Sequence, residues 1–224
     1  CRKAVGFFRK GSATGVRGLR FSTYLIPEKR WVGAGKGERT ELSSRMLGEN
    51  MTDLGDIIRL FRKYGLPFPN EWVRSLTDTA DFLLGETAFT SDGIYPRIWD
   101  ETGKPAEQMD TAAGIPCVQT LIRAYERAGA QRFLRGAEKV LSAYYRLHVQ
   151  TFERPFAYAT MDARCEDKEG GIYFFLAAYD MYRLTGKKDY AEWASLAADW
   201  ILTFVYFWSP EWKRGSPCDR GHFN

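Results

Sequence analysis

The sequence predicts an all-α protein built from helical-hairpin repeats, with a short β-rich segment at its N-terminus. Three observations predict this. Apolar residues recur at helical spacing from about residue 45 onward. Turns inside each predicted helix pair are short, whereas the connections between pairs are long. One helix pair also repeats the residue pattern of the pair before it. The chain has 224 residues, which is long enough for one sizeable hydrophobic core.

The composition excludes several classes of protein. Lys and Arg together number 32 against 28 Asp and Glu, and the basic residues are scattered, so we predict no nucleic-acid partner. No apolar run is long enough for a membrane span. The 4 cysteines have no CxxC spacing and only 2 histidines accompany them, so we predict neither a metal nor another cofactor. Because the chain begins with Cys, we expect a fragment or a chain whose leader has been removed, and we favour an extracytoplasmic location.

Residues 1–45 differ from the rest of the chain and are assigned to a β-rich N-terminal segment with a linker. Residues 5–8 and 19–26 are expected to form short strands, and the second of these alternates with a period of two. The glycine-rich stretch at residues 31–37 lacks the spacing of a phosphate-binding loop, so no phosphate is assigned to it.

The first helical hairpin follows this segment. Leu54 and Ile58 belong to an apolar face with helical spacing. Gly65 is expected to end that helix, and Pro67 prevents its continuation. Asn70 is expected to cap the returning helix.

Two more hairpins are predicted further along the chain. Their helices are expected at residues 111–128, 131–148, 169–184 and 189–207. Gly129 and Gly186 mark the turns inside the hairpins. The two hairpins match at a constant offset, in that Tyr125, Gly129, Phe133, Ala137 and Leu141 correspond to Tyr182, Gly186, Tyr190, Ala194 and Ala198, each 57 positions later. This pattern indicates antiparallel helices clamped by a short turn, with small residues where they approach closely.

The connections between hairpins are long, at residues 86–110 and 150–167, and long loops inside a compact domain are usually functional. Both are expected on the same face of the assembly. The helices that follow them begin with small residues, such as Gly114 and Gly170, which would let these helices crowd around an axis.

This alternation of short and long connections resembles the six-hairpin glycosidase superfamily, whose members have an (α/α)6 toroid. The loop at residues 92–96 (Asp-Gly-Ile-Tyr-Pro) and the acidic loop at residues 162–169 add to the resemblance. It covers residues 46–224, which we assign to an incomplete toroid domain because three hairpins are counted where a toroid has six. The remainder of the same polypeptide, or a homo-oligomer, is expected to complete the structure.

The resemblance implies a carbohydrate-active enzyme with an oligo- or polysaccharide substrate. Glycoside hydrolysis needs two carboxyl groups, about 5–5.5 Å apart for retention of configuration or about 6.5–9.5 Å for inversion. Asp162 and Glu166 are predicted to be this catalytic pair, one as a protonated acid and the other as an ionised base. Capping of the next helix is an equally open explanation for both, and it is the favoured one for Asp110 and Asp167.

Further residues, in the long connections and near the C-terminal end of the sequence, are predicted to bind the saccharide. Aromatic rings can stack on sugar faces, and arginine can pair with a uronate carboxylate. The predicted set is Asp92, Tyr95, Trp99, Asp100, Tyr158, Arg164, Trp208 and His222. At least half of the aromatic rings would be expected to pack beneath the loops instead.

Three functions stay open at this point. The first is a glycoside hydrolase. The second is a polysaccharide lyase, in which Tyr158 or His222 would act as the base and Arg154 or Arg164 would neutralise a uronate. The third is a non-catalytic helical-repeat binding module, which would tolerate neutralisation of the two predicted catalytic carboxylates.

Overall fold

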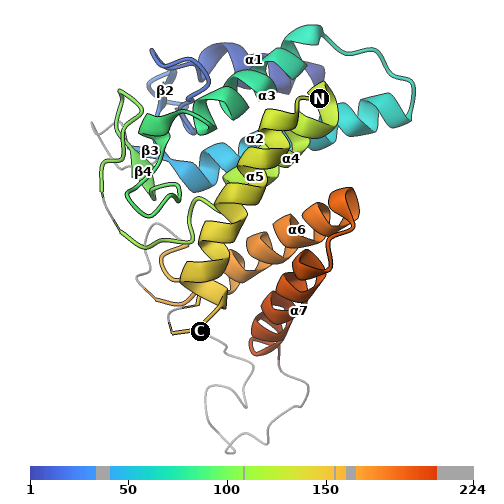
Figure 1. The fold of residues 1–224 in the computed structure, drawn as a ribbon. Coiled ribbons are helices and arrows are strands. Elements are labelled where there is room, and N and C mark those ends of the chain that lie inside the picture. The colour runs from blue at the N-terminus through green and yellow to red at the C-terminus, as the bar shows by residue number, and fades with distance from the viewer. Residues whose placement is uncertain (34–40, 108, 154, 160–164, 206–224) are drawn as a thin grey trace, which may run out of the picture.

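The computed structural model describes residues 1–33, 41–107, 109–153, 155–159 and 165–205, and this part of the chain consists mainly of helices (Figure 1). It confirms the predicted all-α class and the hairpin repeat. The three hairpins are α2 (Ser44–Lys63) with α3 (Asn70–Leu83), α4 (Pro116–Ala128) with α5 (Gln131–Tyr144), and α6 (Lys168–Thr185) with α7 (Lys188–Leu202). A π-helical segment, η2 (Tyr145–Val149), prolongs α5, and a short 3-10 helix, η1 (Glu86–Ala88), follows α3.

The hairpins are arranged in two layers. The first helices of the three hairpins are neighbours, because α4 contacts both α2 and α6. Each second helix packs against the first helix of its own hairpin, and α3 also contacts α4. The result is an inner layer of α2, α4 and α6 with α3, α5 and α7 outside it.

Glycine turns connect the helices of the second and third hairpins as predicted. Gly129 and Gly186 end α4 and α6 in the left-handed conformation, with φ of 67° and 70°. This region favours glycine because a side chain would clash with the backbone there. Each glycine N–H donates to a carbonyl of the preceding helix, that of Tyr125 and that of Tyr182.

Capping of α6 by Asp167 is confirmed. The Asp167 carboxylate Oδ1 accepts a hydrogen bond of 2.8 Å from the backbone N–H of Glu169. It thereby satisfies one of the amide groups that a helix N-terminus leaves without a partner.

Replacing Asp167 with alanine is expected to lower the free energy of unfolding by about 1 kcal/mol, because that amide loses its acceptor. Thermal and urea denaturation of the variant would measure the loss. Asp167→Asn should stay close to the wild-type protein, since asparagine caps equally well. Glu192→Ala, at an exposed position of α7, is the matched control and should change little. Equal stability of the alanine and asparagine variants would contradict the capping role.

Small residues allow the inner helices to approach closely. A Cβ added to Gly48 of α2 would lie 2.5 Å from the backbone nitrogen of Cys117 in α4. One added to Gly114 would lie 2.5 Å from the Tyr144 hydroxyl, and one added to Gly170 would lie 2.8 Å from Cβ of Phe156. The close approach of two inner helices is thus seen at Gly48, whereas the predicted positions Gly114 and Gly170 lie against Tyr144 of α5 and Phe156 of the connection before α6.

The N-terminal segment differs from the prediction. Residues 5–8 belong to a helix, α1 (Arg2–Gly11), because Val5 and Phe8 lie one turn apart and pack against the core. The strand predicted at residues 19–26 is limited to β1 (Thr23–Leu25), which pairs antiparallel with β2 (Arg30–Val32). A second small antiparallel pair joins β3 (Leu42–Ser43) to β4 (Ile98–Trp99) and ties the start of α2 to the following connection.

Two helix starts also differ from the prediction. Asn70 is the first residue of α3 and makes no capping hydrogen bond, because Pro69 occupies the N-cap position. The helix predicted from residue 111 begins at Pro116, a favoured first-turn residue because its missing N–H needs no partner.

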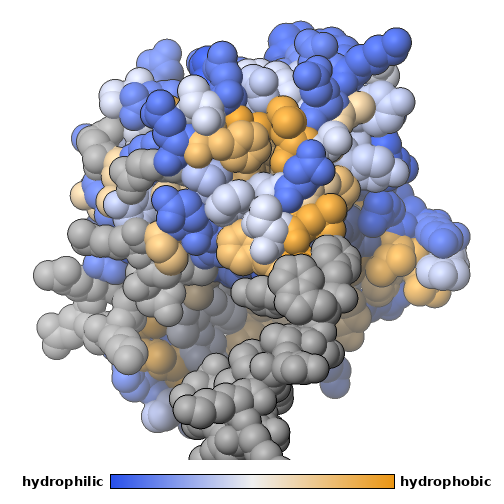
Figure 2. Space-filling view, turned by 90° about the horizontal axis from the view of Figure 1, so that it is seen from below, coloured by the Kyte–Doolittle hydropathy of each residue, from blue (hydrophilic) through white to orange (hydrophobic). Residues whose placement is uncertain are grey.

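On the face drawn in Figure 2, apolar residues form patches among hydrophilic ones. None of the helices in the described ranges combines the length and apolarity needed to cross a bilayer.

Candidate functional site

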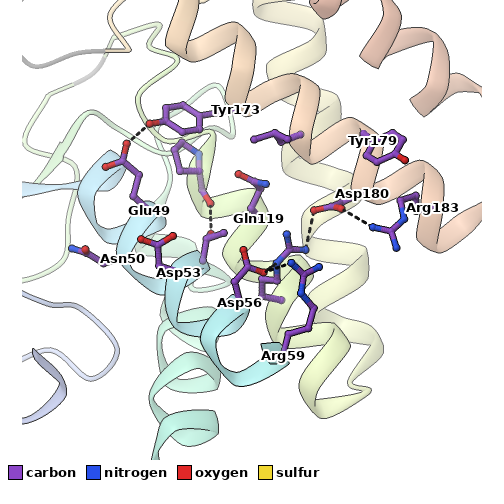
Figure 3. Close-up of a pocket in the computed structure, with 14 residues that line it drawn as sticks. Glu49, Asn50, Asp53, Asp56, Arg59, Gln119, Tyr173, Tyr179, Asp180 and Arg183 are labelled. Atoms are coloured by element: carbon purple, nitrogen blue, oxygen red, sulfur yellow. Dashed lines mark hydrogen bonds and ion pairs between the residues drawn. The ribbon is translucent and has the colours of Figure 1, made fainter. Parts of the chain in front are cut away.

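A hollow of about 630 Å³ lies between the three inner helices (Figure 3). Most of the residues that line it are polar or charged. The side chains labelled in Figure 3 are Glu49, Asn50, Asp53, Asp56 and Arg59 from α2, Gln119 from α4, and Tyr173, Tyr179, Asp180 and Arg183 from α6.

The amphipathic character of α2 explains why polar groups converge here. Glu49, Asp53 and Asp56 follow one another at intervals of four and three residues, so they share one face of the helix. Leu54 and Ile58 lie on the buried face. The apolar face of α2 therefore packs against its neighbours, and the acidic face is left to line the hollow.

Four side chains lie together at one end of the hollow, and we call them the entrance cluster. They are Arg45, Glu49, Glu169 and Tyr173. Arg45 Nε donates to Glu49 Oε1 at 2.9 Å, and Arg45 Nη2 lies 2.5 Å from Glu169 Oε2. The Tyr173 hydroxyl donates to the same Glu49 oxygen. Burial and the contact with Glu49 raise the pKa of Tyr173, so the phenol keeps its proton. The cluster lies at the N-terminal ends of α2 and α6.

The other end is held by the Arg123 network, which consists of Arg123 with Asp56, Glu126 and Asp180. The Arg123 side chain is only 6% exposed. Its Nε lies 2.8 Å from Asp56 Oδ1, and its Nη1 lies 2.8 Å from Asp180 Oδ2 and 3.4 Å from Glu126 Oε2. Burial opposes the charge, but the three carboxylates outweigh it and raise the pKa of Arg123. The network joins all three inner helices.

Asp53 and Gln119 are among the lining side chains that have no polar partner in the described part of the chain. Gln119 is 6% exposed, and its amide faces the hollow. Asp53 is exposed on α2, and partial desolvation, together with the negative charges of Asp56 and Glu49, raises its pKa. A carboxyl group of this kind is protonated more readily than an ordinary aspartate and can act as an acid.

The predicted catalytic pair is only half described. Asp162 lies outside the described residues, as do Arg164, Trp208 and His222 among the predicted binding residues. Glu166 is exposed in the connection before α6 and does not line the hollow.

The prediction that Tyr95 and Trp99 bind the saccharide needs correction, because both rings are fully buried. The Tyr95 hydroxyl donates to the carbonyl of Leu83 at 3.0 Å, and Trp99 Nε1 donates to the carbonyl of Ala88 at 2.9 Å. Their connection folds down onto the outer helix α3, so the rings serve as core and have no free face for a sugar.

The other predicted binding residues that the structure describes, Asp92, Asp100 and Tyr158, do not line the hollow. Asp100 organises its own turn, since its Oδ1 accepts hydrogen bonds from the backbone N–H groups of Thr102 and Lys104. Desolvation acts against the charge of Asp100, but these hydrogen bonds lower its pKa. Asp92 is exposed, and Tyr158 is half-buried beside Thr111, whose hydroxyl donates to the Tyr158 carbonyl.

Asp110 differs from the prediction as well. Asp110 does not cap a helix, because α4 begins only at Pro116. Its Oδ1 instead lies 3.2 Å from Nε2 of His148. His148 is fully buried in η2 and stacks between the rings of Tyr144 and Phe156.

Sequence reasoning missed the residues that line the hollow, although one signal for them was present. Arg123 and Asp180 each interrupt an apolar helix that was recognised from its periodicity. A charge in such a position needs a partner if it is buried. The two charges pair with each other across α4 and α6.

Comparison with known proteins supports the fold. No protein-family model and no curated protein sequence matches the chain. A sugar epimerase from a ruminal bacterium has a similar structure at 12% identity, with a TM-score of 0.67 over 86% of this chain and 50% of that one. A D-mannose isomerase matches at 11% identity with a TM-score of 0.65, over 88% of this chain and 50% of that one.

A GH76 alpha-mannanase from Bacteroides thetaiotaomicron is similar at 9% identity, with a TM-score of 0.56 over 76% of this chain and 44% of that one. The chain thus spans about half the length of the epimerase and isomerase structures. At these identities the likeness is one of fold. The described chain therefore has the architecture of part of an (α/α)6 toroid, as the sequence predicted.

Proposed function

We propose that the chain forms part of a carbohydrate-active enzyme that hydrolyses a glycosidic bond at the hollow between α2, α4 and α6. The observation that carries the proposal is the pair of carboxyl groups on the exposed face of α2, Glu49 and Asp53, in a hollow of about 630 Å³. The fold adds support, because structures of the same architecture include a sugar epimerase, a mannose isomerase and a mannanase.

The spacing of Glu49 and Asp53 suits this chemistry. Residues four apart on a helix have Cβ atoms about 5–6 Å apart. That is close to the carboxyl separation of about 5–5.5 Å in glycosidases that retain configuration. A covalent glycosyl–carboxylate intermediate is therefore the mechanism that this pair favours.

The surroundings of the two carboxyl groups suggest different roles. Asp53 has a raised pKa and would donate a proton to the leaving oxygen. Glu49 is held by Arg45 and Tyr173, which fix its orientation for attack on the anomeric carbon. Water would then release the sugar, with Asp53 accepting its proton.

The sequence-predicted pair, Asp162 and Glu166, remains the competing assignment. Glu166 precedes α6 by two residues, and Glu169 in the first turn of that helix contacts Arg45 of the entrance cluster. A substrate bound at the entrance cluster would therefore pass near the connection that carries the predicted pair.

The test compares the two pairs in the protein expressed from its complete reading frame. Asp53→Asn and Glu49→Gln are each expected to lower the hydrolysis rate by about 10²- to 10⁴-fold, with an unchanged melting temperature. Reducing-end release from neutral polysaccharides, mannans and glucans among them, is the measurement. Asp199→Asn, at an exposed position of α7, is the matched control and should keep full activity.

The double variant Asp162→Asn/Glu166→Gln should keep most of the activity. Loss of activity in this double variant alone would move the active site to the connection before α6. Wild-type activity should fall as the pH rises through the raised pKa of Asp53, because the acid form is lost. Glycan binding without turnover in every form would support the non-catalytic module.

A further inference from the structure

We infer that the hollow binds a neutral sugar ring through the Gln119 amide and the Asp53 carboxyl group, and that it rejects acidic sugars. The inference rests on the proposed function and deepens it by naming the substrate class. It comes from two observations, an amide that faces the hollow without a protein partner in the described ranges and arginines that all have carboxylate partners.

The Gln119 amide provides the stronger of the two observations. It is carried by α4, the central inner helix, and in Figure 3 it lies between the Glu49–Tyr173 side and the Asp56–Asp180 side of the hollow. The residue is 6% exposed, and its amide makes no hydrogen bond to protein within the described ranges. The amide atoms are not among the fully buried unpaired atoms of the described residues, so they open onto the hollow. A pair of ligand hydroxyl groups would hydrogen-bond to them there, because an amide both donates and accepts.

The charges of the hollow then select among saccharides. Arg45 lies 2.9 Å from Glu49, Arg59 lies 3.2 Å from Asp56, and Arg183 lies 3.8 Å from Asp180. Arg123, as described above, is held by three carboxylates. A uronate would have to share one of these arginines with the carboxylate that the arginine already contacts.

The ionisable group left over in the hollow is the Asp53 carboxyl. It would repel a uronate, but it can accept from or donate to a neutral hydroxyl. The wall formed by α6 offers apolar surface as well, since Leu176 and Tyr179 are 39% and 46% exposed. The apolar face of a sugar ring can lie on such a surface. A neutral hydroxylated ring therefore matches the groups that line the hollow better than a negatively charged ring does.

The test measures binding by calorimetry in the Asp53→Asn background of the complete protein, where turnover is expected to be slow. Neutral manno- and gluco-oligosaccharides are compared with oligogalacturonate and oligoguluronate of equal length. We expect the neutral ligands to bind and the uronates to bind at least 10-fold more weakly. Because this background lacks the negative charge, the same uronate comparison in the wild-type protein should show a larger difference.

Gln119→Met is the decisive variant, because it keeps the side-chain volume and removes the amide. Its expected result is at least 10-fold weaker binding of the neutral oligosaccharide, with thermal stability equal to or above that of the parent. A structural glutamine would give the opposite result, a lower melting temperature with unchanged affinity. Gln131→Met, on the exposed start of α5, is the matched control and should change neither property.

Each outcome decides between this inference and the proposed function. Neutral ligands that bind through Gln119 without any turnover would keep the inference and overturn hydrolysis. Hydrolysis of a uronate polymer would keep a hydrolase and overturn the inference. Tighter binding of uronates than of neutral sugars, or no loss of affinity in Gln119→Met, would also overturn it.

Discussion

Replacing Arg123 with methionine is expected to lower the free energy of unfolding by about 3–5 kcal/mol, which is enough to unfold a marginally stable domain. The guanidinium is 6% exposed and holds Asp56 of α2 and Asp180 of α6, each at 2.8 Å. Methionine preserves much of the volume but removes the charge. Glu126 and the two aspartates would then lose their shared buried cation and keep only longer contacts with other arginines, such as that of Asp56 with Arg59 at 3.2 Å.

Urea denaturation of Arg123→Met is the measurement, and Arg132→Met provides the control. Arg132 also contacts a carboxylate, that of Asp81 at 2.9 Å, but both side chains are about half exposed. An exposed pair of this kind contributes less than about 1 kcal/mol. Similar losses in the two variants would show that the Arg123 network does not hold the inner helices together.

A second comparison separates charge from packing. Adding Asp56→Asn and Asp180→Asn to Arg123→Met should recover part of the lost stability, because the uncompensated negative charges disappear. If the loss arose only from poorer packing of the methionine, the added substitutions would not help. The difference between these variants is the coupling energy of the network.

The hairpins were predictable because their signals are local. Helical spacing of apolar residues identifies α4 and α6, and the left-handed turns at Gly129 and Gly186 follow from the freedom of glycine at positive φ. Asp167 could be recognised as a cap from its position just before a long apolar helix. Each of these features depends on residues within a few positions of one another.

The candidate site was not predictable in the same way, because it is assembled from three helices. Asp56 and Arg123 are 67 positions apart, and no local pattern relates them. Periodicity shows that α2 has a polar face, but the polar face of a helix is normally exposed to solvent. Only the arrangement of α2, α4 and α6 side by side turns that face into the wall of a hollow.

The N-terminal error has a different cause. Residues 5–8 form a run of mixed apolar character that is too short for periodicity to separate a strand from a helix. The helical spacing of Val5 and Phe8 becomes decisive only once both residues are seen to pack against the core. Short apolar runs are the positions at which such predictions are weakest.

Replacing Trp99 with alanine is expected to cost about 3–5 kcal/mol of stability, as for other large buried aromatic residues. The ring is fully buried, with its centroid 5.2 Å from that of Phe82 and 6.0 Å from that of Tyr95. Alanine would leave a cavity beside α3 and remove the donor to the Ala88 carbonyl. Trp99→Phe should cost less, because it keeps most of the ring packing and loses mainly that hydrogen bond.

This prediction distinguishes a core role for Trp99 from a role in binding sugar. If Trp99 were a sugar platform, the alanine variant would keep its melting temperature and lose affinity for oligosaccharide. A core residue gives the reverse, a lower melting temperature with unchanged affinity per folded molecule. Tyr179→Ala is the contrasting change, since Tyr179 is 46% exposed on the wall of the hollow. It should weaken oligosaccharide binding with little effect on stability, because nearly half of Tyr179 is exposed whereas Trp99 is fully buried.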